Sequence, residues 1–260
     1  MITSPHNPHI KTIRALLSRR AEREEAGAFV AEGVRLCEEG LLANLQPQIV
    51  LYTALTSARG LELARRFADR GALVEEVPPA LMDQITETEE SQGILAVFPY
   101  PRLELPDHLN YIVVADALRD PGNLGTLLRT ASAAGAQAVL LTPGTTDAFS
   151  PKVVRSAMGA HFRLPIHSMT WDQISRVCKQ RAEPLQILVA EMENARSCWS
   201  MDLRIPLALV VGGEAEGAGS DARRAADDLI CIPMPGRSES LNAAVAAAIL
   251  MFEIVRQRSQ

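Results

Sequence analysis

The chain has 260 residues, of which 47% are hydrophobic and 22% charged, and its formal net charge is -5. This composition is typical of a folded protein, and the length favours two domains over one compact core. A net negative charge gives no overall attraction to nucleic acid, so any RNA binding has to come from a local basic surface.

The four cysteines are scattered along the chain without a C-x-x-C pair. This spacing argues against a zinc site and favours reduced thiols in the cytoplasm. No apolar run reaches the roughly 18 residues that a membrane-spanning helix needs, and the first residues, MITSPHNPHIK, lack the apolar core of a signal peptide. We therefore expect a cytoplasmic protein that has no membrane contact and no bound metal.

The first helix is predicted by apolar residues at helical spacing, Ile10, Ile13, Leu16 and Leu17. Basic residues crowd it, and they are candidates for RNA binding: Lys11, Arg14, Arg19, Arg20 and Arg23. An equally open interpretation is a solvated helix face that Glu22, Glu24 and Glu25 partly neutralise.

Strands and helices alternate through the rest of the first 98 residues. We expect strands at 28–32, 49–52, 73–77 and 94–98, and helices at 34–45 and 61–70. This alternation predicts a small N-terminal α/β domain, residues 1–98. Closely spaced prolines then oppose regular structure and predict a linker, residues 99–107.

Residues 108–260 predict a second α/β domain. The short apolar run YIVVAD, residues 111–116, is typical of a buried parallel strand. We expect further strands at 138–141, 164–167, 186–190, 207–211 and 229–232, and helices at 152–158, 173–181 and 241–256. His161 and His167 have apolar neighbours, which favours core positions over ligand binding.

A turn, DPGN, runs into a helix made of small and apolar residues around one arginine, Arg129. Asn123 is a candidate N-cap of that helix, which would make the segment an ordinary strand–turn–helix joint. Arg129 either extends into solvent or binds a phosphate or a carboxylate.

Glycines follow the strand at 207–211, in the sequence VVGGEAEG, residues 210–217. Glycines at the carboxyl end of a parallel strand let a ligand approach the backbone, although an ordinary glycine turn explains them as well. Neither a G-x-G-x-x-G fingerprint in register nor a P-loop G-K-[ST] is present.

A proline-glycine loop leads into the last helix through Ser240, which is a candidate N-cap. That helix is apolar almost all round, so it needs cover from the core or from a partner subunit. The loop has too few apolar residues to pack its own interior, which favours a ligand beside it.

In this order, the three segments resemble the motifs of the SPOUT superfamily, and more narrowly of SpoU-type (TrmH-type) RNA 2'-O-ribose methyltransferases. We refer to residues 120–136, 210–217 and 232–249 as the first, second and third motifs. PKVVRSAMGAHFRLPI, residues 151–166, also matches the family. The segment 4–36 is similar to the RNA-binding domain of members that act on ribosomal RNA.

The resemblance implies an α/β fold whose parallel sheet ends in a C-terminal deep trefoil knot, beside a small N-terminal RNA-binding domain. It implies a homodimer and S-adenosylmethionine as cofactor. The implied cofactor-binding residues are Gly212, Gly213, Glu214, Ile232, Met234, Ser240, Leu241 and Asn242, and the implied catalytic residues are Arg129, Asn123, Glu214, Ser240 and Asn242.

Two departures from the family pattern affect the fit of the cofactor pocket. Ala243-Ala244 replaces the usual Val-Ser, and Gly217-Ala218 replaces Gly-Leu. Glu214 is either a surface carboxylate after a glycine turn or a negative group near the cofactor's sulfonium.

The leading hypothesis is methylation of a ribose 2'-hydroxyl in RNA, with ribosomal RNA favoured over transfer RNA. The alternatives are a transfer RNA 2'-O-methyltransferase and a catalytically silent RNA-binding SPOUT protein. A nucleotide-dependent enzyme on a standard doubly wound sheet is a third, disfavoured by the missing glycine fingerprint.

Overall fold

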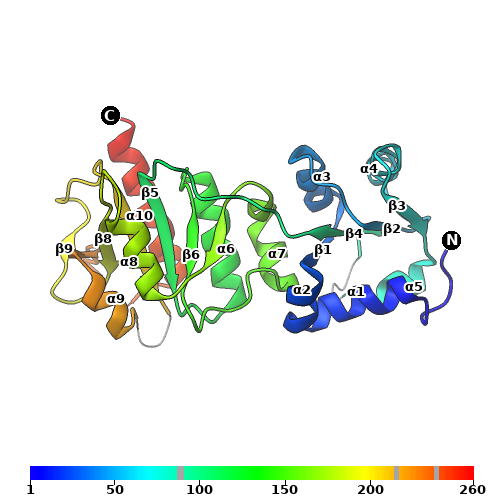
Figure 1. Ribbon diagram of the computed structural model, residues 1–260, viewed down its shortest axis with the longest axis horizontal. Helices are drawn as coiled ribbons and strands as arrows, with labels where there is room; N and C mark the ends of the chain where they lie inside the picture. Colours follow the sequence, from blue (N-terminus) through cyan, green and yellow to red (C-terminus); the bar gives the residue numbers. More distant parts are fainter. Residues whose placement is uncertain (87–90, 214–216, 237–239) are drawn as a thin grey trace. The chain divides into compact units, whose positions relative to one another are not determined.

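The computed structural model describes residues 1–86, 91–213, 217–236 and 240–260. The chain forms two compact units (Figure 1). The first contains Met1–Arg102 together with Phe149–Phe162, and the second contains Leu103–Ala148 together with Arg163–Gln260. The predicted linker, residues 99–107, includes the first point at which the chain passes from one unit to the other.

The first unit is a four-stranded mixed sheet with helices on both faces. β4 is central and pairs antiparallel with β1 and β2, while β3 pairs parallel with β2 at the edge. Its elements are α1 (Pro8–Ser18), α2 (Arg20–Ala26), β1 (Ala28–Glu32), α3 (Val34–Leu42), β2 (Ile49–Tyr52), α4 (Ala58–Asp69), β3 (Leu73–Glu76), α5 (Pro79–Asp83), β4 (Ile94–Pro99), α7 (Pro151–Ala157) and the 3-10 turn η1 (Ala160–Phe162).

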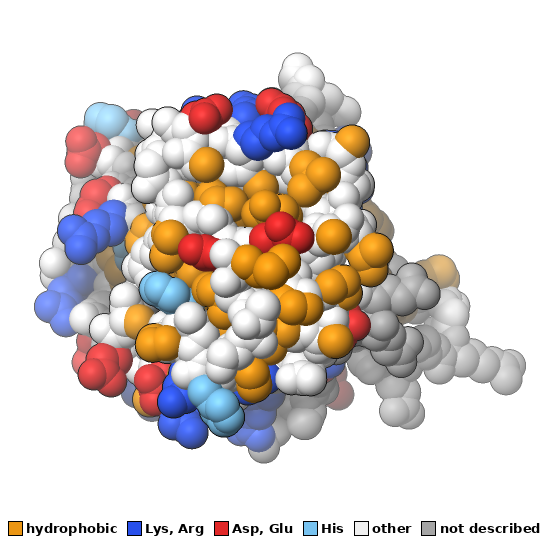
Figure 2. All heavy atoms as spheres, turned by 90° about the vertical axis from the view of Figure 1, so that its right-hand side faces the viewer, with side chains coloured by type: hydrophobic (Ala, Val, Ile, Leu, Met, Phe, Trp, Pro, Cys, Tyr) orange, Lys and Arg blue, Asp and Glu red, His pale blue; other side chains and the backbone are white. Residues whose placement is uncertain are grey.

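Successive side chains of β4 point alternately into the two apolar cores of this unit. Leu95 and Val97 face the apolar side of α1, whereas Ile94, Ala96 and Phe98 pack with residues of α3, α4 and η1. This is the expected consequence of successive strand side chains pointing to opposite faces. Figure 2 shows one end of the unit, where apolar side chains gather around acidic ones in the centre and basic side chains lie mainly at the rim.

The second unit is a seven-stranded sheet in the order β7-β6-β5-β10-β8-β11-β9, and all its strand pairs are parallel. Its elements are β5 (Tyr111–Asp116), α6 (Pro121–Ala133), β6 (Val139–Leu141), β7 (Ile166–Ser168), α8 (Trp171–Lys179), β8 (Gln186–Ala190), β9 (Arg196–Ser197), β10 (Leu207–Gly212), α9 (Ser220–Ala225), β11 (Asp228–Cys231) and α10 (Ala243–Arg258). The prediction of a parallel α/β sheet is confirmed.

Every residue of β5 and of β10 is buried, because both strands lie in the interior of the sheet. α8 and α9 contribute Ile174, Cys178 and Ala222 to the apolar cluster on one face of the sheet. The helices that carry the first and third motifs, α6 and α10, pack against each other, and α10 also contacts β10.

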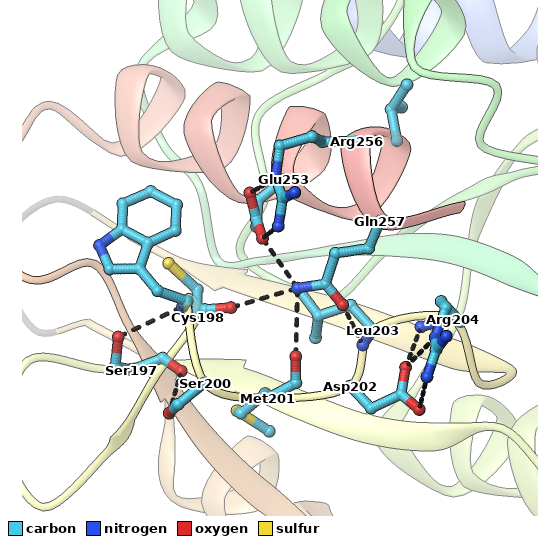
Figure 3. Close-up of polar contacts among 12 residues, drawn as sticks. Ser197, Cys198, Ser200, Met201, Asp202, Leu203, Arg204, Glu253, Arg256 and Gln257 are labelled. Atoms are coloured by element: carbon cyan, nitrogen blue, oxygen red, sulfur yellow. Dashed lines mark hydrogen bonds and ion pairs between the residues drawn. The ribbon is translucent and has the colours of Figure 1, made fainter. Parts of the chain in front are cut away.

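The last turn of α10 holds the segment that follows β9 (Figure 3). Gln257 Oε1 accepts a hydrogen bond from the backbone N of Leu203 (2.8 Å), and Gln257 Nε2 donates to the carbonyl oxygen of Met201 (3.1 Å). The same Nε2 donates to Glu253 Oε1, and hydrogen bonds from Arg256 lower the pKa of the Glu253 carboxyl. These contacts fix the end of α10 against the segment that follows β9.

No helix among the described residues is both long enough and apolar enough to span a membrane.

Candidate functional site

A cavity of about 520 Å³ lies where the carboxyl ends of β8, β10 and β11 meet the beginning of α10. This volume is within the range of about 300–1,000 Å³ that is usual for small-molecule sites. The sequence-predicted cofactor residues that the structure describes all line it: Gly212, Gly213, Ile232, Met234, Ser240, Leu241 and Asn242. The second and third motifs are therefore brought together around one cavity, while Glu214 lies outside the described residues.

Part of the cavity wall was not predicted from the sequence. Glu191 and Met192 follow β8, and Ala243, Ala246 and Leu250 come from α10. Ligands of open α/β sheets bind outside the carboxyl ends of the strands, so the position after β8 carried a usable signal. The Glu191 carboxylate accepts a hydrogen bond from Arg223 Nε at 2.9 Å, which places one ion pair at the wall.

The glycines of the second motif allow the backbone to fold closely on itself. Gly213 and Gly217 form an isolated antiparallel bridge, and Gly217 has a φ of +65°, which favours glycine. A Cβ on Gly212 would lie 2.2 Å from the Gly217 carbonyl carbon and from the Ala218 nitrogen. Gly212 is thus explained by backbone packing, and the packed backbone in turn forms part of the cavity wall.

Asn242 is the N-cap of α10, because its Oδ1 accepts from the backbone N of Ala244 (3.0 Å) and of Val245 (3.2 Å). The prediction of Ser240 as N-cap was wrong. The helix begins at Ala243, so Ser240 lies too far upstream to reach its free N–H groups, and it lines the cavity instead.

Asn123 does not cap α6 either. Asp120 is the N-cap and its Oδ1 accepts from the Asn123 backbone N at 2.8 Å, since α6 already begins at Pro121. The Asn123 side chain is therefore available for another contact. Its Oδ1 accepts from Asn242 Nδ2 at 2.9 Å, which joins the first motif to the third.

Arg129 lies on α6, six residues after Asn123, which is roughly 9 Å along the helix axis. Its side chain is exposed, and within the part of the chain that the structure describes it makes no hydrogen bond or ion pair. The described lining of the cavity does not include Arg129. Arg129 is therefore an exposed residue outside the described lining, on the helix that Asn123 joins to the third motif.

The basic N-terminal residues do not form one group. Lys11, Arg19 and Arg20 are exposed, and Arg19 and Arg20 pair with Glu22 and Glu24 at 3.3 Å and 2.7 Å. The pairing agrees with the open alternative of a partly neutralised helix face. Arg14 is half-buried, and its Nη2 donates to Gln84.

Arg23 differs from the other basic residues because it is only 4% exposed. Its Nη1 donates to the carbonyl oxygens of Leu16 and Leu17, the last buried positions of α1. The helix predicted here is in fact two helices that break at Arg19, and Arg23 joins them. A buried, engaged guanidinium is not placed to bind RNA.

The histidines lie as expected, outside the site. His161 is 2% exposed and its ring lies among those of Phe29 and Phe149, while His167 Nε2 contacts the carbonyl oxygen of Leu103. Within residues 1–86, 91–213, 217–236 and 240–260, no group of three or more His, Cys, Asp or Glu side chains has the arrangement of a metal site.

Comparison with known proteins assigns the two parts of the chain. Residues 110–252 match the SpoU rRNA Methylase family, and residues 7–96 match the MRM3-like substrate binding domain. The 23S rRNA (guanosine(2553)-2'-O)-methyltransferase RlmP of Bacillus subtilis is 33% identical over 254 residues, with 97% of this chain and 98% of the relative covered.

Two solved structures are similar over almost the whole chain. The AdoMet-bound rRNA methyltransferase from Sinorhizobium meliloti has a TM-score of 0.87 and 34% identity, covering 98% of this chain and 97% of its own. The SpoU methyltransferase AviRb from Streptomyces viridochromogenes, in complex with AdoMet, has a TM-score of 0.84 and 28% identity, covering 97% and 99%. The chain therefore belongs to the SpoU rRNA Methylase family.

Proposed function

We propose that this protein transfers a methyl group from S-adenosylmethionine to a ribose 2'-hydroxyl of ribosomal RNA. The observation that carries the proposal is the cavity, because residues of the second and third motifs surround it and Asn242 ties it to the first motif. The named relatives support ribosomal RNA as the substrate: RlmP of Bacillus subtilis is named as a 23S rRNA methyltransferase, and so is RlmB of Xylella fastidiosa.

The residues of the cavity fit S-adenosylmethionine. Ile232, Met234, Leu241 and Leu250 offer apolar surface for a planar adenine ring, while Glu191 is an acceptor for amino or hydroxyl groups. A cavity that is mostly apolar, with few polar groups, is the usual composition of a cofactor site. When bound there, S-adenosylmethionine supplies a sulfonium methyl group that is already reactive toward oxygen.

The protein's own task is to align the ribose oxygen and to manage its proton. Arg129 keeps its charge, since a guanidinium in a protein does not give up its proton. In our proposal it binds the 3'-phosphate or stabilises the developing alkoxide, and a water or phosphate oxygen takes the proton. Asn123 and Asn242 hold the first and third motifs together through their hydrogen bond. We propose Glu214 and Ser240 as further site residues.

The proposal includes three further elements: a homodimer in which Arg129 acts across the interface, the trefoil knot, and RNA binding by the N-terminal unit. The dimer is supported by the exposed apolar residues of α10, Val245 and Phe252, at 48% and 50%. The match to the MRM3-like substrate binding domain supports RNA binding by the first unit. We also propose a cytoplasmic location, because the relatives RlmP and RlmB are named as bacterial 23S rRNA methyltransferases.

The decisive experiment compares ribosomal and transfer RNA purified from cells that lack the protein. Incubation with the protein and tritiated S-adenosylmethionine should label ribosomal RNA, and site mapping should show a 2'-O-methyl group. Label in transfer RNA alone would favour the transfer RNA alternative. Tight RNA binding without label would identify a silent RNA-binding protein.

A further inference from the structure

Asp116 is a buried carboxylate at the end of β5, with only 4% of the residue exposed. Its Oδ1 accepts from Thr142 Oγ1 (2.8 Å) and from Trp171 Nε1 (3.0 Å), and its Oδ2 accepts from the backbone N of Gly219 (2.7 Å). In the described parts of the chain no lysine, arginine or histidine pairs with it. A buried carboxylate without a cation depends on such donors, so all three bonds are strongly held.

The bond to Gly219 connects β5 with the segment that leaves the second motif. Two residues earlier, Gly217 lines the cavity and bridges to Gly213. Gly212, which is the register partner of Asp116 on β10, packs against Ala218. The position of Gly219 therefore determines where the backbone from 217 to 219 lies, and with it one wall of the cavity.

A second connection leads from the same bond to Glu191, which lies beside Gly217 in the cavity wall. Gly219 precedes α9, and its carbonyl oxygen accepts from the backbone N of Arg223 at 3.1 Å. Arg223 Nε in turn donates to Glu191, which lines the cavity. Releasing Gly219 from Asp116 would thus loosen both Gly217 and the partner of Glu191.

We propose that Asp116 is a positioning residue for the cofactor cavity. It lies outside the described lining and holds Gly219, which keeps Gly217 and Glu191 in the arrangement that binds S-adenosylmethionine. This inference rests on the proposed function and deepens it by adding a residue that controls cofactor affinity without touching the cofactor.

The test is the binding of S-adenosylhomocysteine to the full chain carrying Asp116→Asn, measured by calorimetry. The amide has a donor where the carboxylate had an acceptor, so one buried donor loses its partner. We expect a roughly tenfold to hundredfold weaker Kd. The KM for S-adenosylmethionine should rise, while kcat at saturating cofactor and the Kd for RNA stay within about twofold.

Asp227→Asn is the matched control. The Asp227 carboxylate also holds a strand, because its Oδ2 accepts from the backbone N of Ile187 (2.7 Å) and pairs with Lys179, but Asp227 does not line the cavity. This variant should lower the melting temperature and leave the Kd for S-adenosylhomocysteine within about twofold.

Gly219→Ala perturbs the hydrogen bond to Asp116 through its donor residue. It tests the inference if Asp116→Asn does not fold. A Cβ on Gly219 would lie 3.3 Å from Asp116 Oδ2, and the φ of -67° accepts alanine. We expect a Kd several-fold weaker, and effects that are not additive with those of Asp116→Asn. Unchanged affinity in these variants would overturn the inference, whereas a wild-type chain that does not bind S-adenosylhomocysteine would overturn the proposed function instead.

Discussion

Asn242 Nδ2 donates a hydrogen bond to Asn123 Oδ1 over 2.9 Å, across 119 residues of sequence. The Asn242 Oδ1 at the same time caps α10. One amide thus performs two tasks with its two ends: the oxygen starts the helix of the third motif, and the nitrogen ties that helix to α6. The two tasks can be separated by substitution.

Asn242→Asp keeps the capping oxygen but replaces the donor with a second oxygen that faces Asn123. We expect a melting temperature close to that of the wild type and a kcat/KM lower by roughly tenfold, the effect of one lost hydrogen bond. Asn242→Ala removes both contacts and should in addition lose about 1 kcal/mol of stability. Chemical denaturation and methyl-transfer assays distinguish the two; full activity of Asn242→Asp would show that the bond to Asn123 is not used.

Arg129→Ala should lower kcat by about 10²–10³ and leave the Kd for S-adenosylhomocysteine within twofold, because the lost contact stabilises charge only in the transition state. Arg129→Lys keeps the charge without the two-pronged geometry and should recover part of the rate. Arg176→Ala, an exposed arginine on α8, is the control and should be unaffected. Near-normal turnover of Arg129→Ala would remove this residue from the mechanism.

The exposed basic residues of α1 and α2 can be tested by the salt dependence of RNA affinity. Combined replacement of Lys11, Arg19 and Arg20 by alanine should weaken RNA binding and reduce the slope of log K against log salt by about two to three. Binding of S-adenosylhomocysteine should not change. Arg65→Ala with Arg66→Ala, exposed on α4 of the same unit, is the control; an equal loss there would mean that the effect is one of net charge alone.

The reactivity of Cys231 measures whether a ligand occupies the cavity, because Cys231 lines the cavity and is only partly buried. Alkylation of Cys231 by iodoacetamide at pH 8 should slow by roughly tenfold at a ligand concentration near ten times Kd, and NAD should not protect it. The other cysteines are internal controls. Burial raises the pKa of Cys178 and of Cys198 to about 11, so few of their thiolates exist at pH 8. Mass spectrometry measures the alkylation of each cysteine. Protection of Cys231 by NAD alone would favour the nucleotide-dependent alternative.

Most strands were predictable from short apolar runs, although β9 was not predicted and β7 lies at Ile166–Ser168 instead of 164–167. The strands at 28–32, 49–52, 111–116 and 186–190 have the predicted bounds, because burial on both faces leaves little room for polar residues. The helix starts were less predictable: Asn123 and Ser240 were the candidate caps, whereas Asp120 caps α6 and Asn242 caps α10. At α6 the proline at 121 was the missed signal: proline favours the first helical position, which makes Asp120 the cap.

Contacts between distant segments could not be predicted from one sequence. Nothing near Arg23 indicates that its guanidinium is buried against the end of α1, because the break at Arg19 has no proline or glycine to mark it. Glu191 and Asp116 likewise look like ordinary acidic residues after apolar strands. Only the order of strands in the sheet brings one to the cavity and the other to Gly219.

The first unit is made of two separate pieces of chain, and this affects any attempt to exchange it. Phe162 and Phe149, from the second piece, lie 5.6 Å and 5.2 Å from Phe29, measured between ring centroids. A fragment that stops at residue 102 keeps Phe98 and Tyr100 beside the Phe29 ring but loses the rings of Phe149 and Phe162. A chimera that is meant to change RNA specificity has to graft residues 149–162 together with the N-terminal hundred, so recombination between relatives at a single crossover would separate parts that fold as one.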